Sequence, residues 1–390
     1  MKHPKIKVAH ILSSPLQNHG GLNLLVRELV VGLAPYFDTV VISPQGLSNP
    51  PLASGVKDAC QRHPWPDNST LAEIETHIRG IANEKGIDFL IFHGGEFGWG
   101  SCRGRKSMMR CLSDLPAKKL YVNHQSSPWF RHLPSVENPS VKPTLTSAIS
   151  FIRLVFLKHL QLAKTDLEIC VSKAETRQAR KRYYLFRKKI NLIYHSRICN
   201  TNIQNFNPHI KRKIILAMGH FAYRKGQHTL IEAFGKIARN HPEWSLKLVG
   251  GSDRGEYWEY MQKIVRHHDI ADQIKFVTET SDPDIHFEHA SIFVQPSLEE
   301  AYGLALQEAM SFGCACIGSN VGGIPDSIEN RSFLFPPGNS DELASILERL
   351  MRNGQLLADA QKECRASFLA HKRTYENMIA EYRRTIENIH

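Results

Sequence analysis

Short apolar runs alternate with amphipathic helical stretches along this chain of 390 residues. Its first half holds five runs with the length of a buried strand, at 8–12, 39–43, 89–93, 119–124 and 167–172. A helical stripe of leucine and valine follows the first run, directly after Gly20 and Gly21. Such runs separated by helices indicate a parallel sheet covered by helices on both faces.

The same pattern then restarts after a polar, Asn-rich stretch that has no periodicity. We therefore predict two Rossmann-like, doubly wound α/β domains, at 1–197 and 213–368, joined by a linker at 198–212. The last residues, 369–390, form a charged amphipathic helix that could pack back on the first domain. Two such domains facing each other leave a cleft at the carboxyl ends of their strands, where ligands of this architecture bind.

The composition indicates which kinds of partner the protein binds and in which cellular compartment it works. Lys and Arg exceed Asp and Glu by 11, which favours an anionic partner such as phosphates, nucleic acid or an acidic membrane face. None of the 8 cysteines forms a Cys-x-x-Cys pair, so we expect reduced thiols in a cytoplasmic protein. No stretch approaches the ~18 apolar residues of a membrane span.

Two carboxylates flank a glycine in the segment SLEEAYGLALQEAM, residues 297–310. A helix beginning after Gly303 would leave its first N–H groups unpaired, and such groups together with the helix dipole bind phosphate. Glu300 would then stand just before the helix and Glu308 one turn inside it, so both could accept hydrogen bonds from sugar hydroxyls. A nucleotide sugar, with a sugar at each end of a diphosphate, fits this pattern. The alternative is a solvated helix carrying two surface acids.

The longer segment SLEEAYGLALQEAMSFGCACIGSNVGGIPD resembles the Glu-x7-Glu region of glycosyltransferase family 4, the retaining nucleotide-sugar transferases of GT-B fold. The resemblance implies that Glu300 contacts the donor sugar, that the backbone of Tyr302, Gly303 and Leu304 meets sugar and phosphate, and that Glu308 binds the ribose. The segment departs mildly from the family pattern at Ala301, Tyr302 and Asp326.

A second segment, residues 218–234, resembles the family's Gly-Arg-x4-Lys-Gly motif. Lys225 matches the lysine that grips the diphosphate, where a cation stabilises the charge that develops on the leaving group. His220 stands where the family has arginine, and Arg224 could supply the lost charge. The alternative for this segment is a basic surface loop.

The resemblance also implicates the first domain. It implies that Gly20 and Gly21 lie near the donor phosphate or the acceptor, and that His124 faces the donor sugar. It places the nucleotide base against the backbone near Val277. Together with His124, Lys225 and Glu300 complete the predicted catalytic set. No Asp-x-Asp is placed to hold a cation on the diphosphate, so we expect no metal and no cofactor besides the UDP- or GDP-linked donor.

Residues 151–190 carry eleven Lys and Arg against three Asp and Glu, with aromatic residues interleaved. This composition suits an anionic membrane surface, and it also suits nucleic acid. A solvated helix face is the plainest alternative. For an enzyme acting on a lipid-linked sugar, membrane docking is the coherent choice, and we expect no nucleic-acid partner.

The sequence thus predicts a retaining glycosyltransferase acting on a glycan or lipid-linked acceptor in lipopolysaccharide, capsule or other cell-envelope polysaccharide synthesis. It would be cytoplasmic or peripheral on the cytoplasmic face of the inner membrane. One alternative keeps the fold but makes the protein a nucleotide-sugar epimerase or a phosphorylase. Another is a non-catalytic basic scaffold that binds membrane or nucleic acid.

Overall fold

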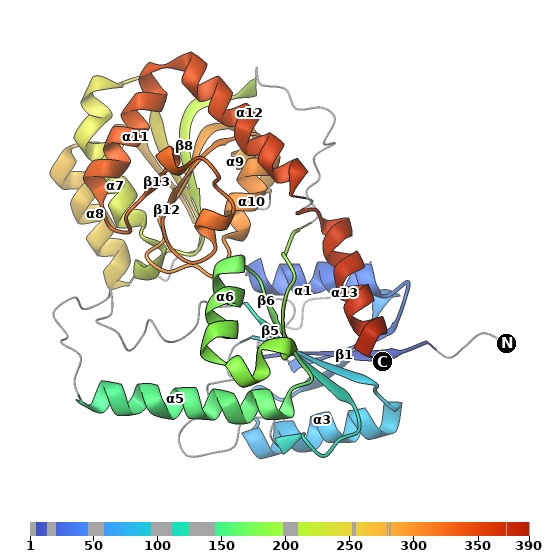
Figure 1. Ribbon diagram of the computed structural model, residues 1–390. Helices are drawn as coiled ribbons and strands as arrows, with labels where there is room; N and C mark the ends of the chain where they lie inside the picture. Colours follow the sequence, from blue (N-terminus) through green and yellow to red (C-terminus); the bar gives the residue numbers. More distant parts are fainter. Residues whose placement is uncertain are drawn as a thin grey trace. The chain divides into compact units, whose positions relative to one another are not determined.

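The computed structural model describes residues 5–13, 21–45, 58–94, 111–124, 145–197, 210–251, 255–278, 280, 282–371 and 373–389. These divide into two compact units. Among the described residues, unit 1 comprises those up to 124, those of 145–197 and those from 374 on, and unit 2 comprises those of 210–373. Both are drawn in Figure 1, and each is described by itself below.

Unit 1 is built on a seven-stranded parallel sheet with the strand order β3-β2-β1-β4-β5-β6-β7. The strands are β1 (Lys7–Leu12), β2 (Asp38–Pro44), β3 (Gln61–Trp65), β4 (Phe89–His93), β5 (Lys118–Asn123), β6 (Leu167–Cys170) and β7 (Ile190–Leu192). Every strand pair is parallel. The strand order reverses direction between β1 and β4, which makes this pair the switch point of the sheet.

The helices of unit 1 are α1 (Gly21–Leu33), α3 (Leu71–Lys85), α5 (Leu145–Lys164), α6 (Lys173–Arg182) and the C-terminal α13 (Tyr375–Ile389), with a 3-10 turn η3 (Tyr184–Lys189). Helix α13 packs on α1, where the hydroxyl of Tyr375 donates to the carbonyl of Glu28 over 2.9 Å. Gly32 permits this approach, because a Cβ there would lie 2.4 Å from the side chains of Ile379 and Tyr375.

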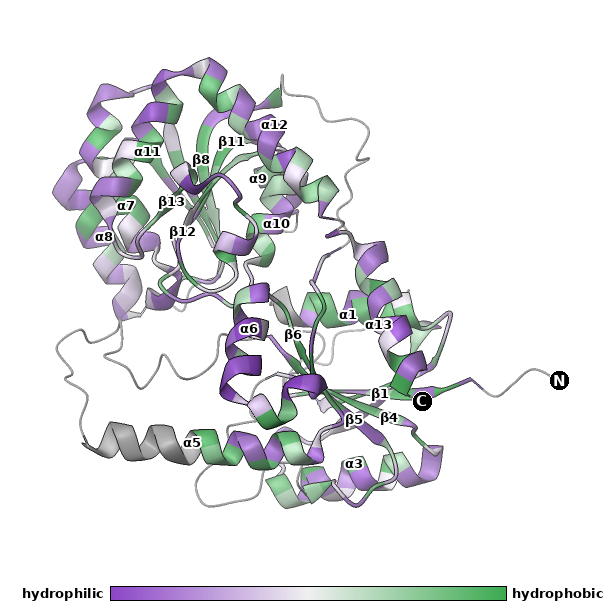
Figure 2. Cartoon of the chain, viewed as in Figure 1, coloured by the Kyte–Doolittle hydropathy of each residue, from purple (hydrophilic) through white to green (hydrophobic). Residues whose placement is uncertain are grey.

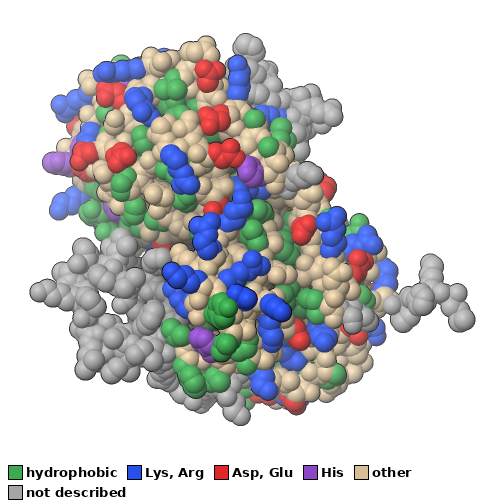
Figure 3. Space-filling model, in the orientation of Figure 1, with side chains coloured by type: hydrophobic (Ala, Val, Ile, Leu, Met, Phe, Trp, Pro, Cys, Tyr) green, Lys and Arg blue, Asp and Glu red, His purple; other side chains and the backbone are tan. Residues whose placement is uncertain are grey.

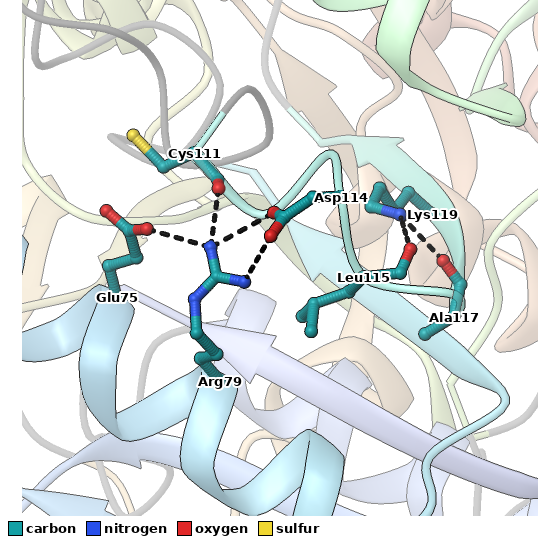
Figure 4. A network of polar contacts seen from close by, with 7 residues as sticks. All are labelled: Glu75, Arg79, Cys111, Asp114, Leu115, Ala117 and Lys119. Atoms are coloured by element: carbon teal, nitrogen blue, oxygen red, sulfur yellow. Dashed lines mark hydrogen bonds and ion pairs between the residues drawn. The ribbon is translucent and has the colours of Figure 1, made fainter.

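Polar contacts fix the segment that leads into β5 (Figure 4). The Arg79 guanidinium on α3 binds both carboxylate oxygens of Asp114, at 2.8 and 3.1 Å, and the carbonyl of Cys111 at 2.8 Å. The ammonium of Lys119 donates to the carbonyls of Leu115 and Ala117. The Lys119 bonds satisfy a buried ammonium, and the Arg79 bonds tie the segment before β5 to α3.

Unit 2 repeats the architecture with a six-stranded parallel sheet, in the order β10-β9-β8-β11-β12-β13. The strands are β8 (Arg212–Met218), β9 (Ser245–Val249), β10 (Ile274–Val277), β11 (Ala290–Gln295), β12 (Ala315–Ser319) and β13 (Leu334–Phe335). Its helices are α7 (Gln227–Ile237), α8 (Glu256–His268), α9 (Asp284–His289), α10 (Leu304–Ser311), α11 (Ser340–Arg352) and α12 (Gly354–Ala370), and its 3-10 turns include η5 (Tyr223–Lys225) and η8 (Ile324–Asp326). The switch point of this sheet lies between β8 and β11.

One apolar core joins the sheet of unit 2 to its helices. It includes Ile215, Leu248, Phe293 and Ile317 from the strands. The helices contribute one face each, so hydrophobic and hydrophilic residues alternate along them in Figure 2. The two parallel, helix-covered sheets confirm the predicted fold class. In the described parts of the chain, no helix has the length and apolar character needed to cross a membrane.

Candidate functional site

Lys225 and Glu300 come from neighbouring strand ends at the switch point of unit 2. Lys225 ends η5, which follows β8, and Glu300 follows β11, the strand next to β8 in the sheet. In open α/β sheets, ligands bind outside the carboxyl ends of the strands at such a point. The Lys225 ammonium lies 2.7 Å from Oε2 of Glu300, in an ion pair whose side chains are 19% and 11% exposed.

The hydrogen bonds that described residues donate to the Glu300 carboxylate all go to one of its two oxygens. Oε2 accepts from the ammonium of Lys225, from the side-chain amide of Gln295 at 3.1 Å and from the hydroxyl of Ser297 at 3.2 Å. Within the described residues, Oε1 accepts no hydrogen bond. The side chain is therefore fixed in direction while one oxygen keeps its capacity to bind a ligand hydroxyl.

The electrostatics keep Glu300 ionised. Burial by itself raises the pKa of this carboxyl group, but the charge and hydrogen bond of Lys225, helped by the charge of Arg224, outweigh it and lower the pKa below its ordinary value. The site therefore presents an ionised carboxylate beside the Lys225 side chain at neutral pH.

Backbone contacts bring the two strand ends together. The N–H groups of Leu298 and Glu299 donate to the carbonyl of Arg224, at 2.8 and 3.2 Å. Gly226 follows Lys225 with a φ of +67°, and a Cβ at this position would lie 2.0 Å from the carbonyl oxygen of Pro296. Only glycine tolerates both this backbone angle and this approach, so Gly226 allows the two strand ends that carry Lys225 and Glu300 to lie close together.

Replacing Gly226 with alanine is expected to destabilise unit 2 and to disturb the ion pair. The left-handed angle costs an L-residue about 1–2 kcal/mol, and the contact with the Pro296 carbonyl adds to that cost. Gly338→Ala is the matched control, because Gly338 has a φ of +78° but its nearest neighbour, a side-chain carbon of Leu298, would lie 3.8 Å from the new Cβ. Urea unfolding should show a larger loss of stability for Gly226→Ala. Equal losses would mean that the close approach contributes nothing.

Helix α10 begins beside this pair. Gly303 is its N-cap, with a φ of +87° and no capping side chain, so Leu304 is the first helical residue. The carbonyl of Gly303 accepts from the N–H groups of Leu306 and Gln307. Glu308, in the second turn, is 8% exposed. The helix predicted from the sequence at this glycine is confirmed.

The other residues singled out in unit 2 lie at the same carboxyl edge of the sheet. The side chain of Arg224 is exposed, next to Lys225, and that of Tyr302 is buried, next to Gly303. His220, after β8, is exposed, and its carbonyl accepts from the side-chain amide of Gln227. Val277 ends β10, the edge strand, and its carbonyl accepts from the N–H of Gly250 at 2.9 Å. That carbonyl is therefore already engaged within the sheet.

The residues predicted in the first domain lie in unit 1. Gly20 is outside the described residues, and Gly21 begins α1. His124 follows β5 and is partly exposed. Its Nε2 lies 3.1 Å from Nδ1 of His93, which ends β4.

Sequence reasoning missed several of the contacting groups. Gln295 is not among the residues predicted above, although a polar side chain in the last position of an otherwise apolar strand is a signal for it. In unit 1, sequence reasoning missed His10, which contacts His93, and His195, whose ring lies 4.9 Å from that of His124. These histidines are far apart in the sequence, so only the fold brings them together.

Comparison with known proteins assigns the second unit to a family. Residues 200–367 match the family model described as "Glycosyl transferases group 1", which is less than half of the chain. An uncharacterized glycosyltransferase from Haemophilus influenzae is 27% identical over 232 residues, 58% of this chain. That match spans 62% of the relative's own length, and matches to three other curated relatives span 40 to 44% of theirs.

Solved structures extend the likeness in fold to the whole chain. Anabaena Alr3699/HepE, solved in complex with UDP-glucose, superposes with a TM-score of 0.71 at 16% identity, covering 98% of this chain and 99% of that one. WaaG, a glycosyltransferase involved in lipopolysaccharide biosynthesis, gives 0.71 at 14% identity, covering 96% and 98%.

The class of protein follows from the fold and the domain together. Two doubly wound units and these neighbours show that the chain has the GT-B fold. Its second unit, which carries Lys225, Glu300 and Glu308, is a glycosyl transferases group 1 domain.

Proposed function

We propose that the chain is a retaining glycosyltransferase that moves a sugar from a UDP- or GDP-linked donor to a glycan or lipid-linked acceptor, without a metal ion. The observation that carries the proposal is the Lys225–Glu300 pair at the β8/β11 switch point, with one carboxylate oxygen uncommitted. The family match over the same residues and the UDP-glucose complex of a protein with this fold support it.

Each group has a role that its position allows. The Lys225 ammonium neutralises charge on the departing diphosphate, and the exposed Arg224 adds to that field. The uncapped first turn of α10 offers backbone N–H groups and the positive end of a helix dipole to the same phosphates. Oε1 of Glu300 accepts from a hydroxyl of the donor sugar, and Glu308 from the ribose. His124 is the proposed contact from unit 1 to the donor sugar.

Donor binding is the first test. Nucleoside diphosphates at 100 times their dissociation constant should stabilise the protein by about 2.7 kcal/mol, which appears as a rise in melting temperature. A screen of common nucleotide sugars by mass spectrometry, with and without acceptor, then names the donor. A sugar product made from donor alone would indicate the epimerase alternative. No stabilisation by any nucleoside diphosphate would favour the non-catalytic scaffold.

Lipopolysaccharide, capsule or another cell-envelope polysaccharide is the proposed destination of the sugar. Its support is the fold shared with WaaG and a basic, partly apolar surface on unit 1. Lys and Arg side chains gather over α6 and η3 in Figure 3. Exposed cations at this surface include Lys181, Arg187 and Lys188.

Large apolar side chains also stand exposed on η3 and α5. Leu185 is 83% exposed, Tyr184 62% and Phe156 61%. The Arg187 guanidinium lies 4.4 Å from the centre of the Tyr184 ring. Apolar tips surrounded by cations suit an anionic bilayer, because the apolar groups enter the headgroup region while the cations meet lipid phosphates.

Not every cation of residues 151–190 belongs to this surface. The ammonium of Lys158 is buried, 2.5 Å from the Glu168 carboxylate. Lys189 donates to the carbonyls of Leu162 and Thr165. These two residues hold α5 and β6 in place, so the charge available to a membrane is smaller than the sequence count.

Reversing the charges of Lys181, Arg187 and Lys188 to Glu is expected to weaken binding to anionic vesicles about 100-fold or more. Each cation near an acidic leaflet contributes ~1 kcal/mol, and high salt should reproduce the loss. Sedimentation with vesicles containing an anionic phospholipid measures the affinity. Three exposed cations of unit 2, Arg239, Lys263 and Lys275, give a matched control of equal charge change. Equal weakening by both triples would mean that net charge, not this surface, drives binding.

A further inference from the structure

A row of buried imidazoles crosses the switch point of unit 1. Nδ1 of His10, on β1, lies 2.9 Å from Nε2 of His93, on the neighbouring β4. Nδ1 of His93 lies 3.1 Å from Nε2 of His124, after β5. The rings stack, with centroids 5.2 and 5.4 Å apart. Both nitrogens of His93 are therefore used, and the row leads from a fully buried ring to a partly exposed one.

The fold gives each ring its place. His10 and His93 occupy adjacent strands at the point where the strand order reverses, and both are at most 1% exposed. Gly94, with a φ of +52°, follows β4, and a Cβ there would lie 3.5 Å from the His124 ring. On its other side, the His124 ring contacts His195, whose Nε2 lies 2.9 Å from the buried Tyr382 hydroxyl on α13.

Hydrogen-bond chemistry then couples the three rings. A neutral imidazole has one N–H and one bare nitrogen. If Nδ1 of His93 donates to His124, its Nε2 must accept from His10, so all three rings carry the proton on Nδ1. If instead Nε2 of His93 donates to His10, its Nδ1 must accept from His124, so all three carry it on Nε2. For neutral rings, no other arrangement makes both bonds.

The third arrangement would charge His93, which would then donate from both nitrogens. Burial opposes it. Burial, and then the neighbouring imidazoles, hold the pKa of His93 well below the ordinary value. Burial also lowers the pKa of His10 to about 3. The row is therefore neutral at pH 7.

The outer end of the row is the group that the proposed reaction uses. Nδ1 of His124 makes no hydrogen bond to the described part of the chain. In the first arrangement it presents an N–H to a ligand, and in the second a bare nitrogen. We propose that His10 and His93 are positioning residues that hold His124 in one tautomeric state shared by all three rings, so that this shared state sets whether Nδ1 of His124 donates or accepts.

The tautomers themselves can be measured without any substrate. Selective ¹⁵N-histidine labelling and long-range ¹H–¹⁵N spectra at pH 7 report which nitrogen of each ring is protonated, and single substitutions assign the signals. We expect His10, His93 and His124 to carry the proton on the same nitrogen. Mixed tautomers, or a doubly protonated ring among the three, would overturn the proposal.

A matched pair of variants tests the consequence for catalysis, which rests on the proposed transferase function. The amide of His93→Asn reaches the position of Nδ1 and keeps a partner for His124, whereas that of His93→Gln reaches the position of Nε2 and keeps a partner for His10 only. We expect His93→Asn to retain kcat within about tenfold, and His93→Gln to lose about 10- to 100-fold in kcat with little change in KM, as when the group that orients a functional histidine is removed.

The two variants should unfold at similar temperatures, and only His93→Gln should show two populated tautomers of His124. Equal kinetic losses in both variants would refute the positioning role even if both fold. A wild-type chain with a shared tautomer but no transfer activity with any donor would instead contradict the proposed function and leave the row intact.

Discussion

Replacing Lys225 with methionine is expected to lower kcat about 10²- to 10³-fold, the range found when a donor that stabilises transition-state charge is removed. Methionine keeps most of the length of the side chain but carries no charge. The departing diphosphate then develops its charge without a partner, and the loss should fall on kcat more than on KM.

The same change acts on Glu300. Burial raises the pKa of this carboxyl group, and Lys225 makes the largest contribution to lowering it. Without the ammonium, the carboxyl group takes up a proton at higher pH, so the acidic limb of the kcat/KM profile should move toward neutral pH. Kinetics from pH 5 to 9 measure both effects.

Two further variants serve as controls for this prediction. Lys225→Arg retains the charge and should recover part of kcat. Lys236→Met removes a lysine of α7 that pairs at 2.6 Å with Asp341, a largely exposed residue, and should leave kcat unchanged. A Lys225→Met enzyme with wild-type kcat and an unmoved acidic limb would refute the role of the ion pair.

The fold could be predicted from the sequence because most central strands contain a short apolar run. Strands buried on both faces of a sheet read this way, as do residues 89–92 of β4 and 292–294 of β11. Two of the edge strands, β3 and β13, could not be found by the same rule. β3 reads QRHPW and is only partly buried, and β13 has two residues, so neither leaves an apolar run.

Some residues of the candidate site could be predicted from the sequence, and others could not. Glu300, Gly303 and Lys225 stand in local patterns next to strand ends, so the sequence could single them out and the structure brings Glu300 and Lys225 into contact. The partners that fix them come from tertiary contact. His10 and His195 are separated by 185 residues in the sequence. No local pattern predicts that the His10 ring contacts His93 and that the His195 ring contacts His124.

Acidification between pH 6.5 and 4.5 is expected to destabilise unit 1 strongly. Burial lowers the pKa of both His10 and His195 to about 3. In this window the unfolded chain binds a proton at each imidazole while the folded chain does not, so the free energy of unfolding falls as the pH falls. Each imidazole contributes about 1.4 kcal/mol per pH unit, and the lowered pKa values of His93 and His124 act in the same direction.

A fall of two pH units therefore lowers the free energy of unfolding by about 5 kcal/mol through His10 and His195 alone. This loss is comparable with the whole stability of many domains. Hydrogen exchange followed by mass spectrometry separates the units, and β1, β4 and β5 should lose protection at a higher pH than β8 and β11. His10→Asn keeps an amide near Nδ1 but does not titrate, so it should reduce the slope in unit 1 by about 1.4 kcal/mol per pH unit. A slope unchanged by this substitution would show that His10 is already charged in the folded protein, because only an imidazole that stays neutral on folding makes acid destabilise the fold.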